Sequence, residues 1–154
     1  GMQVKSENDD NIRELLSVAH DVRTVEDALR KAEIERDKER RDAAELAKIP
    51  LVTGAVGRFD GTVTVLKPYE NGPDGLAYPR YTDLFPEPPP EGLVPACAEA
   101  GVIGALTGVI GTLMAMEAIK VITGIGEPLV GRLLMYDGLA ARFDTIRYKR
   151  RAGT

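Results

Sequence analysis

Residues 84–126 read LFPEPPPEGLVPACAEAGVIGALTGVIGTLMAMEAIKVITGIG, a proline-rich loop that runs directly into a glycine-studded apolar segment. Residues 100–116 carry no charged side chain, and a glycine at position 124 marks the end of the apolar run. The pattern predicts a helix over residues 102–122. A membrane-spanning helix needs about 20 predominantly apolar residues, so we expect a buried helix and no membrane partner.

Short segments rich in β-branched residues lie on both sides of this stretch. Residues 50–56 and 62–66 read as two strands joined by a tight connection. Residues 131–136 and 141–148 read as a hairpin around Asp137-Gly138. Residues 67–93 are rich in proline and glycine and predict a long loop. The expected product is an α/β (mixed α+β) fold, in which the long glycine-rich helix packs on one face of a small mixed sheet.

Residues 1–48 form a charged helical segment, and residues 49–154 form a second domain. The first segment holds 13 acidic and 10 basic side chains. Its pattern predicts a short helix followed by a second helix that Thr24 caps. The apolar faces of these two helices would be Ile12, Leu15, Leu16 and Ala19, and Val25, Ala28, Leu29 and Ala32. The charged run after Ile34 predicts a solvated helix, with a partner-binding helix as the alternative.

The composition excludes several classes of protein. A net charge of −4 argues against nucleic-acid binding. A single cysteine excludes an intramolecular disulfide framework and a multi-cysteine metal site. No apolar leader begins the sequence, so we expect a cytoplasmic protein. No GxGxxG or Walker A motif is present, so no phosphate-cradling loop is expected. The basic residues 147–151 predict a solvated chain end.

Two features of the 84–126 stretch are candidates for function. Cys97 precedes the predicted helix, where the helix dipole favours a thiolate; an inert cysteine is the alternative. Four glycines spaced 3, 4, 3 fall on one face of that helix. They predict either close packing on the sheet or a close helix–helix contact in a homodimer. These interface candidates are Gly101, Gly104, Gly108 and Gly111.

Several segments together resemble one protein family. They are IPLVTGAVGRFDG at 49–61, LFPEPPP at 84–90, VPACAEAG at 94–101, EAIK at 117–120, GIGEPLVGRLL at 124–134, and Tyr136-Asp137. In this order and spacing, from about Asp42 onward, they resemble the MoeB/ThiF family of E1-like, ubiquitin-like-protein-activating adenylyltransferases. The resemblance implies the C-terminal half of the E1-like fold, with a crossover loop at about 68–100. Residues 1–41 do not resemble the family.

The resemblance also implies chemistry. Family members use ATP and Mg²⁺ to adenylate the C-terminal Gly-Gly of a MoaD- or ThiS-like ubiquitin-fold sulfur carrier. By resemblance, Cys97 is the candidate catalytic residue, and Arg58 and Phe59 are candidate carrier-binding residues. The Rossmann half of the family is missing, and Tyr78-Pro79-Arg80-Tyr81 replaces the first CxxC pair of the zinc site. No ATP, magnesium or zinc is therefore expected in this chain.

The expected function is that of a truncated carrier-binding and dimerisation module related to molybdopterin or thiamine biosynthesis. The alternative is one subunit of a split adenylyltransferase whose ATP site comes from a partner chain. On either reading we expect the chain alone to be inactive. The identity of the carrier and the pathway stay open at this point.

Overall fold

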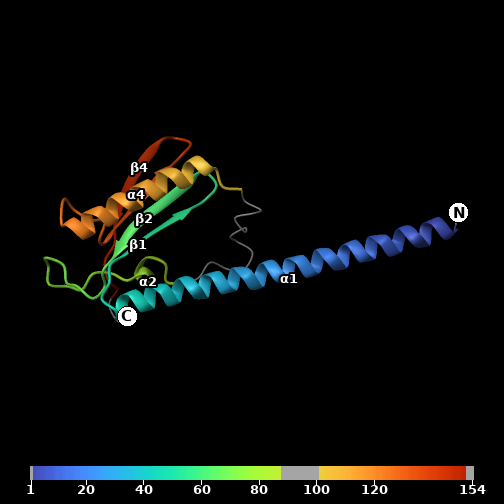
Figure 1. Ribbon diagram of the computed structural model, residues 1–154, viewed down its shortest axis with the longest axis horizontal. Helices are drawn as coiled ribbons and strands as arrows, with labels where there is room; N and C mark the ends of the chain where they lie inside the picture. Colours follow the sequence, from blue (N-terminus) through green and yellow to red (C-terminus); the bar gives the residue numbers. More distant parts are fainter. Residues whose placement is uncertain (1, 88–100, 152–154) are drawn as a thin grey trace. The chain divides into compact units, whose positions relative to one another are not determined.

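A computed structural model describes residues 2–87 and 101–151 of the 154-residue chain (Figure 1). The chain divides into two compact units, Gly1–Glu39 and Arg40–Thr154. The boundary between the units lies inside the first helix. The second unit contains a four-stranded sheet and the long glycine-rich helix, so the fold is mixed α/β, as the sequence predicted.

Helix α1 runs without interruption over Met2–Leu46. The prediction of two helices with a cap at Thr24 is therefore wrong. The helix continues past Thr24 because no glycine or proline lies between residues 2 and 46 to interrupt its backbone hydrogen bonds. The chain leaves the helix at Lys48, which has a left-handed φ of 53°.

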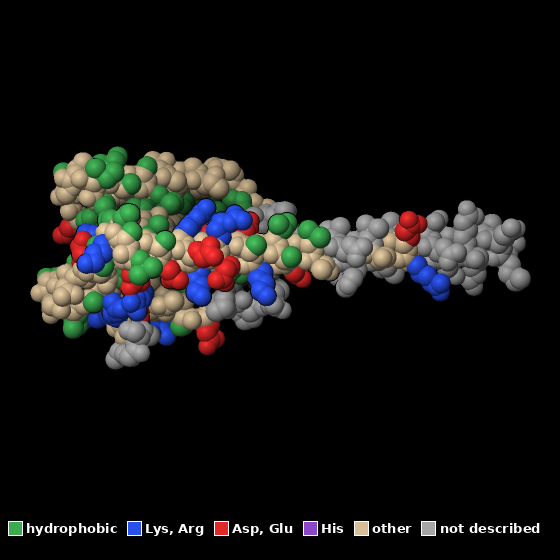
Figure 2. Space-filling model, turned by 60° about the horizontal axis from the view of Figure 1, so that its bottom comes forward, with side chains coloured by type: hydrophobic (Ala, Val, Ile, Leu, Met, Phe, Trp, Pro, Cys, Tyr) green, Lys and Arg blue, Asp and Glu red, His purple; other side chains and the backbone are tan. Residues whose placement is uncertain are grey.

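The expected inward face of α1 is also not found in the second predicted segment. Val25 is 59% exposed and Leu29 is 61% exposed. The charged run is solvated, as expected: the side chains of residues 31–40 are exposed. Figure 2 shows acidic and basic side chains interspersed along this part of the helix.

The sheet contains strands β1 (Leu51–Val56), β2 (Asp60–Leu66), β3 (Arg132–Asp137) and β4 (Arg142–Arg147) in the order β1-β2-β3-β4. All neighbouring strands pair antiparallel. One isolated parallel bridge joins Val65 to Val130, just before β3. The predicted strands and hairpin are thus confirmed to within one or two residues.

Helix α4 (Gly104–Thr123) lies across β1 and β2 (Figure 1). Gly124 ends it with a left-handed φ of 73°, as the sequence predicted. The buried core between helix and sheet consists of Val63, Val65, Leu106, Ile110 and Leu129.

Two strand glycines allow α4 to approach the sheet closely. A Cβ on Gly61 would lie 2.5 Å from Ile110 Cδ1, and a Cβ on Gly54 would lie 2.6 Å from Met114 Sδ. A larger residue at either position would require the Met114 or Ile110 side chain of α4 to shift. The close approach therefore depends on glycines in β1 and β2, and not on those in the helix.

A buried carboxylate fastens α4 to the segment that leads into β3. Glu117 is only 4% exposed. Its Oε2 accepts a hydrogen bond from the Leu129 N–H at 2.8 Å, and its Oε1 pairs with Lys120 Nζ. The Leu129 carbonyl in turn accepts a hydrogen bond from the Val65 N–H at 3.1 Å. Glu117 thus links the helix, the 124–131 segment and the central strand.

The face of the sheet opposite α4 is closed near one end by polar contacts. The Thr64 Oγ1 lies 2.8 Å from the Arg132 carbonyl oxygen and 2.8 Å from Tyr148 Oη. Thr64 has one proton to donate. When it donates to the carbonyl, it accepts from Tyr148. Buried Asp83, in the short helix α2 (Tyr81–Leu84), accepts from the Arg80 and Arg151 backbone N–H groups at 2.7 and 3.0 Å.

Replacing Glu117 with alanine should leave the buried Leu129 N–H without its acceptor. We expect the free energy of unfolding in urea at pH 7 to fall by about 1–3 kcal/mol. Glu117→Gln should lose less, because its amide oxygen can still accept that hydrogen bond. The matched control is Glu127→Ala, since Glu127 is 89% exposed and 3.9 Å from its partner Arg132. Equal losses for Glu117→Ala and Glu127→Ala would contradict the linking role of Glu117.

Tyr148 should make stability depend on alkaline pH. Burial raises the pKa of Tyr148 above its ordinary value of 10.0; the Thr64 hydrogen bond offsets part of this rise and the charge of Asp83 adds to it. The unfolded chain therefore releases the phenol proton first, so the contribution of Tyr148 to the free energy of unfolding should be constant well below pH 10 and decrease above it. Tyr148→Phe should cost about 1 kcal/mol at pH 7 and show a shallower decline above pH 10. Parallel stability curves for the two proteins would refute this role.

Candidate functional site

The two turns at one end of the sheet bring Arg58 and Phe59 beside the β3–β4 turn. Gly57 N–H donates to the Asp60 carbonyl at 2.8 Å, which closes the β1–β2 turn. Gly138 N–H donates to the Phe59 carbonyl at 2.7 Å. A Cβ on Gly138 would lie 2.7 Å from that carbonyl oxygen, so the two turns approach as closely as backbone allows. We call this end of the sheet the tip.

Large apolar side chains are exposed at the tip. Phe59 is 39% exposed, Leu139 is 75% exposed and Phe143 is 51% exposed. The Phe143 ring stacks on Tyr136 with 4.6 Å between centroids, which limits its motion. Arg58 is also exposed. Restrained aromatic rings beside an arginine are typical of protein-binding surfaces.

The glycines of α4 do not pack on the sheet. Among residues 2–87 and 101–151, a Cβ on Gly104, Gly108 or Gly111 would meet nothing within 4 Å. Gly101 precedes the helix and has a left-handed φ of 65°. The packing alternative is therefore wrong, because Leu106, Ile110 and Glu117 face the sheet instead. The interface alternative stays a prediction.

The outward face of α4 continues from these glycines into exposed apolar residues. Met116 is 48% exposed, Ile119 45% and Ile122 82%. The expectation of a buried helix thus holds for only one side of α4. By length and composition alone α4 could cross a membrane. The same criterion is met by core helices of soluble proteins, and α4 carries the Glu117–Lys120 ion pair.

Cys97 lies outside the described residues, so its position relative to the tip and to α4 stays a prediction. Within residues 2–87 and 101–151, no group of three or more His, Cys, Asp or Glu side chains could hold a metal ion.

The Tyr78–Tyr81 segment, expected in place of a zinc-binding pair, is held to the end of α1 by an ion pair and a cation–π contact. Arg80 Nη2 and Nε lie 2.6 and 2.8 Å from Glu45 Oε1. The Arg41 guanidinium lies 4.1 Å from the centroid of the Tyr81 ring. These contacts join the last turns of α1 to α2, a short helix inside what the sequence predicted to be loop.

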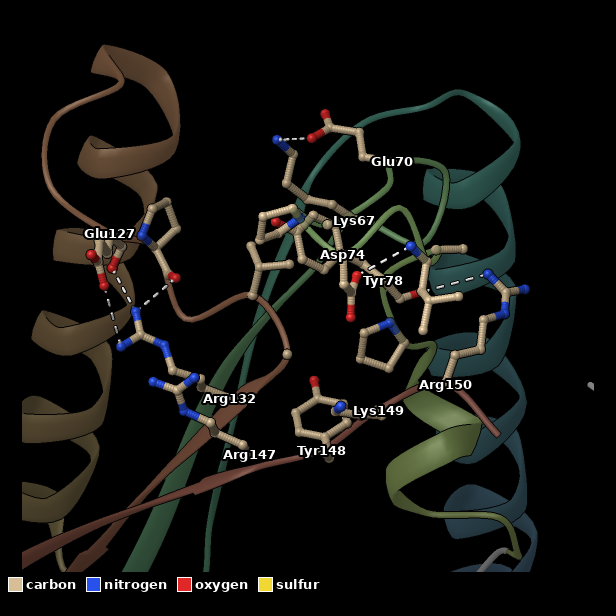
Figure 3. Close-up of a pocket in the computed structure, with 18 of the residues that line it drawn as sticks. Lys67, Glu70, Asp74, Tyr78, Glu127, Arg132, Arg147, Tyr148, Lys149 and Arg150 are labelled. Carbon is tan, nitrogen blue, oxygen red and sulfur yellow. Dashed lines mark hydrogen bonds and ion pairs between the residues drawn. The ribbon is translucent and has the colours of Figure 1, made fainter. Parts of the chain in front are cut away.

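A basic pocket of about 680 Å³ opens at the other end of the β3–β4 hairpin (Figure 3). The sequence-based reading missed it and assigned residues 147–151 to a solvated chain end. Tyr148 and Arg150 are instead fixed: Arg150 Nη1 donates to the Pro68 and Tyr78 carbonyls at 3.2 and 3.5 Å. The cluster of cations in the tail was the available signal, but the carbonyls that Arg150 contacts lie 82 and 72 residues away in the sequence.

Comparison with known proteins identifies one family and several related proteins. The ThiF family model matches residues 3–153, including the charged helix that the sequence reading left outside the resemblance. The chain is 50% identical over 113 residues to a probable adenylyltransferase/sulfurtransferase MoeZ of Mycobacterium tuberculosis, covering 73% of this chain and 28% of that protein. It is 54% identical over 110 residues to the sulfur carrier protein adenylyltransferase of Thermus thermophilus, covering 71% and 40%.

A eukaryotic relative extends the same pattern. The adenylyltransferase and sulfurtransferase MOCS3 of Drosophila grimshawi is 44% identical over 108 residues, which cover 70% of this chain and 23% of that protein. The chain therefore spans two fifths or less of the length of these relatives. With the family model matching nearly its whole length, the chain belongs to the ThiF family.

Proposed function

We propose that this chain supplies the carrier-docking and self-association surfaces of a sulfur-carrier adenylyltransferase. The observation that carries the proposal is the tip, where exposed Phe59, Leu139 and Phe143 surround a turn that also presents Arg58. Relatives that share this segment are named sulfur carrier protein adenylyltransferase and adenylyltransferase and sulfurtransferase. A carrier of ubiquitin fold would dock an apolar patch on these rings, and Arg58 would contact its acidic or carbonyl groups.

Adenylation itself needs groups that this sequence lacks. ATP phosphates and Mg²⁺ must be held by oriented amides and charges while the carrier carboxylate attacks the α-phosphorus and pyrophosphate leaves. No GxGxxG or Walker A loop is present in these 154 residues. In the proposal, Cys97 is the acceptor for the activated carrier: its thiolate attacks the acyl carbon, a thioester forms and AMP leaves.

A second proposal is that the chain is one subunit of a split adenylyltransferase. It is favoured by the combination of a missing phosphate-binding loop with adenylyltransferase names among relatives that are more than twice as long as the matched segment. The ATP site would then come from a partner chain that carries a nucleotide-binding Rossmann half.

We further propose a homodimer through the outward face of α4. No described residue lies within 4 Å of a Cβ built on Gly104, Gly108 or Gly111, so this part of the face permits two helix backbones to approach closely. The exposed Ile119 and Ile122 would be covered in the same contact.

Substitution of Phe59 by alanine should weaken binding of a ubiquitin-fold sulfur carrier with a Gly-Gly terminus about tenfold or more, because a ring of this kind is a typical hot spot. Isothermal titration of the full chain with the carrier measures the effect, and Arg58→Ala should weaken binding in the same direction. The matched control is Phe85→Ala, since Phe85 is 43% exposed but lies in the segment that follows α2.

Equal affinity for Phe59→Ala and the unmodified chain would refute docking at the tip. An ATP–pyrophosphate exchange assay with carrier present then separates the two proposals. Exchange that begins only when a Rossmann-half chain is added supports the split enzyme. Exchange by the chain alone would contradict both.

Gly108→Ala should separate helix stability from self-association. Because a Cβ at this position meets no described residue within 4 Å, the substitution should stabilise the monomer by about 0.5–1 kcal/mol through helix propensity. The added methyl groups should at the same time weaken a dimer that depends on close backbone contact. Urea unfolding at low concentration and sedimentation equilibrium measure the two effects. A monomeric unmodified chain at high micromolar concentration would refute the dimer.

A further inference from the structure

We propose that the basic pocket at the β3 start and β4 end binds a small organic phosphate, a phosphate ester with an apolar or ring-shaped body. The pocket is formed by three segments: residues 67–79, residues 120–132 and residues 147–150. Its volume of about 680 Å³ lies in the range typical of small-molecule sites. All of its walls belong to the second compact unit.

The charge of the lining favours an anion. Six cationic and three anionic side chains surround the pocket. The cations are Lys67, Lys120, Arg132, Arg147, Lys149 and Arg150, and the anions are Glu70, Asp74 and Glu127. The chain as a whole carries a net charge of −4, so this local excess of positive charge runs against the overall balance.

The register of the hairpin places two arginines directly opposite each other. Arg132 and Arg147 are cross-strand partners, so their side chains leave the sheet on the same face, and Figure 3 shows both at the pocket. Like charges in directly opposed positions destabilise an antiparallel pair. Within the described residues Arg147 makes no hydrogen bond or ion pair, and the Glu127 carboxylate is 3.9 Å from Arg132 and highly exposed. A bound dianion between the two guanidinium groups would offset this repulsion.

The arginine that begins β3 is held in position before any ligand arrives. Arg132 Nη2 donates to the carbonyls of Glu127 and Pro128, each at 3.0 Å. The segment that carries those carbonyls is itself fixed by the Glu117–Leu129 hydrogen bond. A side chain that is already held in place loses little conformational entropy on binding. Most of its electrostatic attraction to an anion therefore contributes to the binding free energy.

The remaining walls suit the organic body of the ligand. Leu76, Pro79, Val121, Pro128 and Val130 line the pocket together with the Tyr148 ring. A free inorganic phosphate would leave these apolar surfaces in contact with water. A phosphate ester that covers them would gain roughly 25 cal/mol for each Å² of apolar surface buried.

The pocket and the tip lie at opposite ends of one hairpin. Residues 132 and 147 begin and end it at the pocket, whereas residues 137 and 142 flank the turn at the tip. Six-residue strands span about 17–20 Å. The pocket and the tip therefore share no residue, so the experiments on the pocket and on carrier docking can fail separately.

The test is isothermal titration of the full chain with phenyl phosphate at low salt, with phenol and inorganic phosphate as companion probes. We expect phenyl phosphate to bind more tightly than either companion. Arg147→Gln should weaken phenyl phosphate binding about tenfold or more, since a charge-assisted hydrogen bond contributes roughly 1.5–3 kcal/mol. Arg147→Lys should retain part of the affinity.

The matched control is Arg142→Gln at the other end of the same strand, where Arg142 pairs with Asp144 at 2.8 Å. It should bind phenyl phosphate like the unmodified chain. Without ligand, Arg147→Gln should be as stable as the unmodified chain or more stable, because the substitution removes the opposed charge. The proposal is overturned if phenyl phosphate binds no better than phenol, if inorganic phosphate binds equally well, or if Arg142→Gln and Arg147→Gln weaken binding equally.

Discussion

The fold depends on one buried carboxylate. Glu117 is almost fully withdrawn from solvent, and an isolated charge there would be strongly unfavourable. It is tolerated because each oxygen has a partner: the Leu129 N–H and the Lys120 ammonium group. The same bonds hold the 124–131 segment against α4, and that segment supplies the carbonyl to which Val65 in the central strand donates. The hydrogen bonds of Glu117 therefore help to position the core, the start of β3 and Arg132.

The order of strands and helix could be predicted from the sequence because the local signals agree. Alternating β-branched residues, the Asp137-Gly138 turn and the glycine after the apolar run each define an element that the structure contains. The faces of α4 could not be predicted in the same way. The helix is apolar nearly all round, so its periodicity does not identify the side that meets the sheet. The glycines that permit close packing are Gly54 and Gly61 in the strands. A glycine inside a strand indicates that another part of the molecule packs closely there, but it does not identify which part.

Other features escaped the sequence-based reading because they depend on distant residues. The interruption expected at Thr24 rested on a capping pattern, yet such a side chain caps a helix only where the preceding residues are not already helical. The pocket escaped because its walls come from three separated segments, and the opposition of Arg132 and Arg147 follows from the hairpin register alone. The candidate residues Arg58 and Phe59 were identified from the family resemblance alone. Their neighbours Leu139 and Phe143 were not, since a hydrogen bond from Gly138 brings the second turn to them.

Both ends of the β3–β4 hairpin carry side chains in positions that are unfavourable for stability. At the tip, large apolar side chains face water; at the pocket, two like charges oppose each other across a strand pair. Local choices that conflict with stability are expected chiefly where a surface has to bind something. The hairpin between them is held at both ends, because Tyr136 and Phe143 stack at one end and Tyr148 is hydrogen-bonded to Thr64 at the other. In this member of the ThiF family, the two ends of one hairpin are therefore the places among the described residues where we expect partners or ligands to bind.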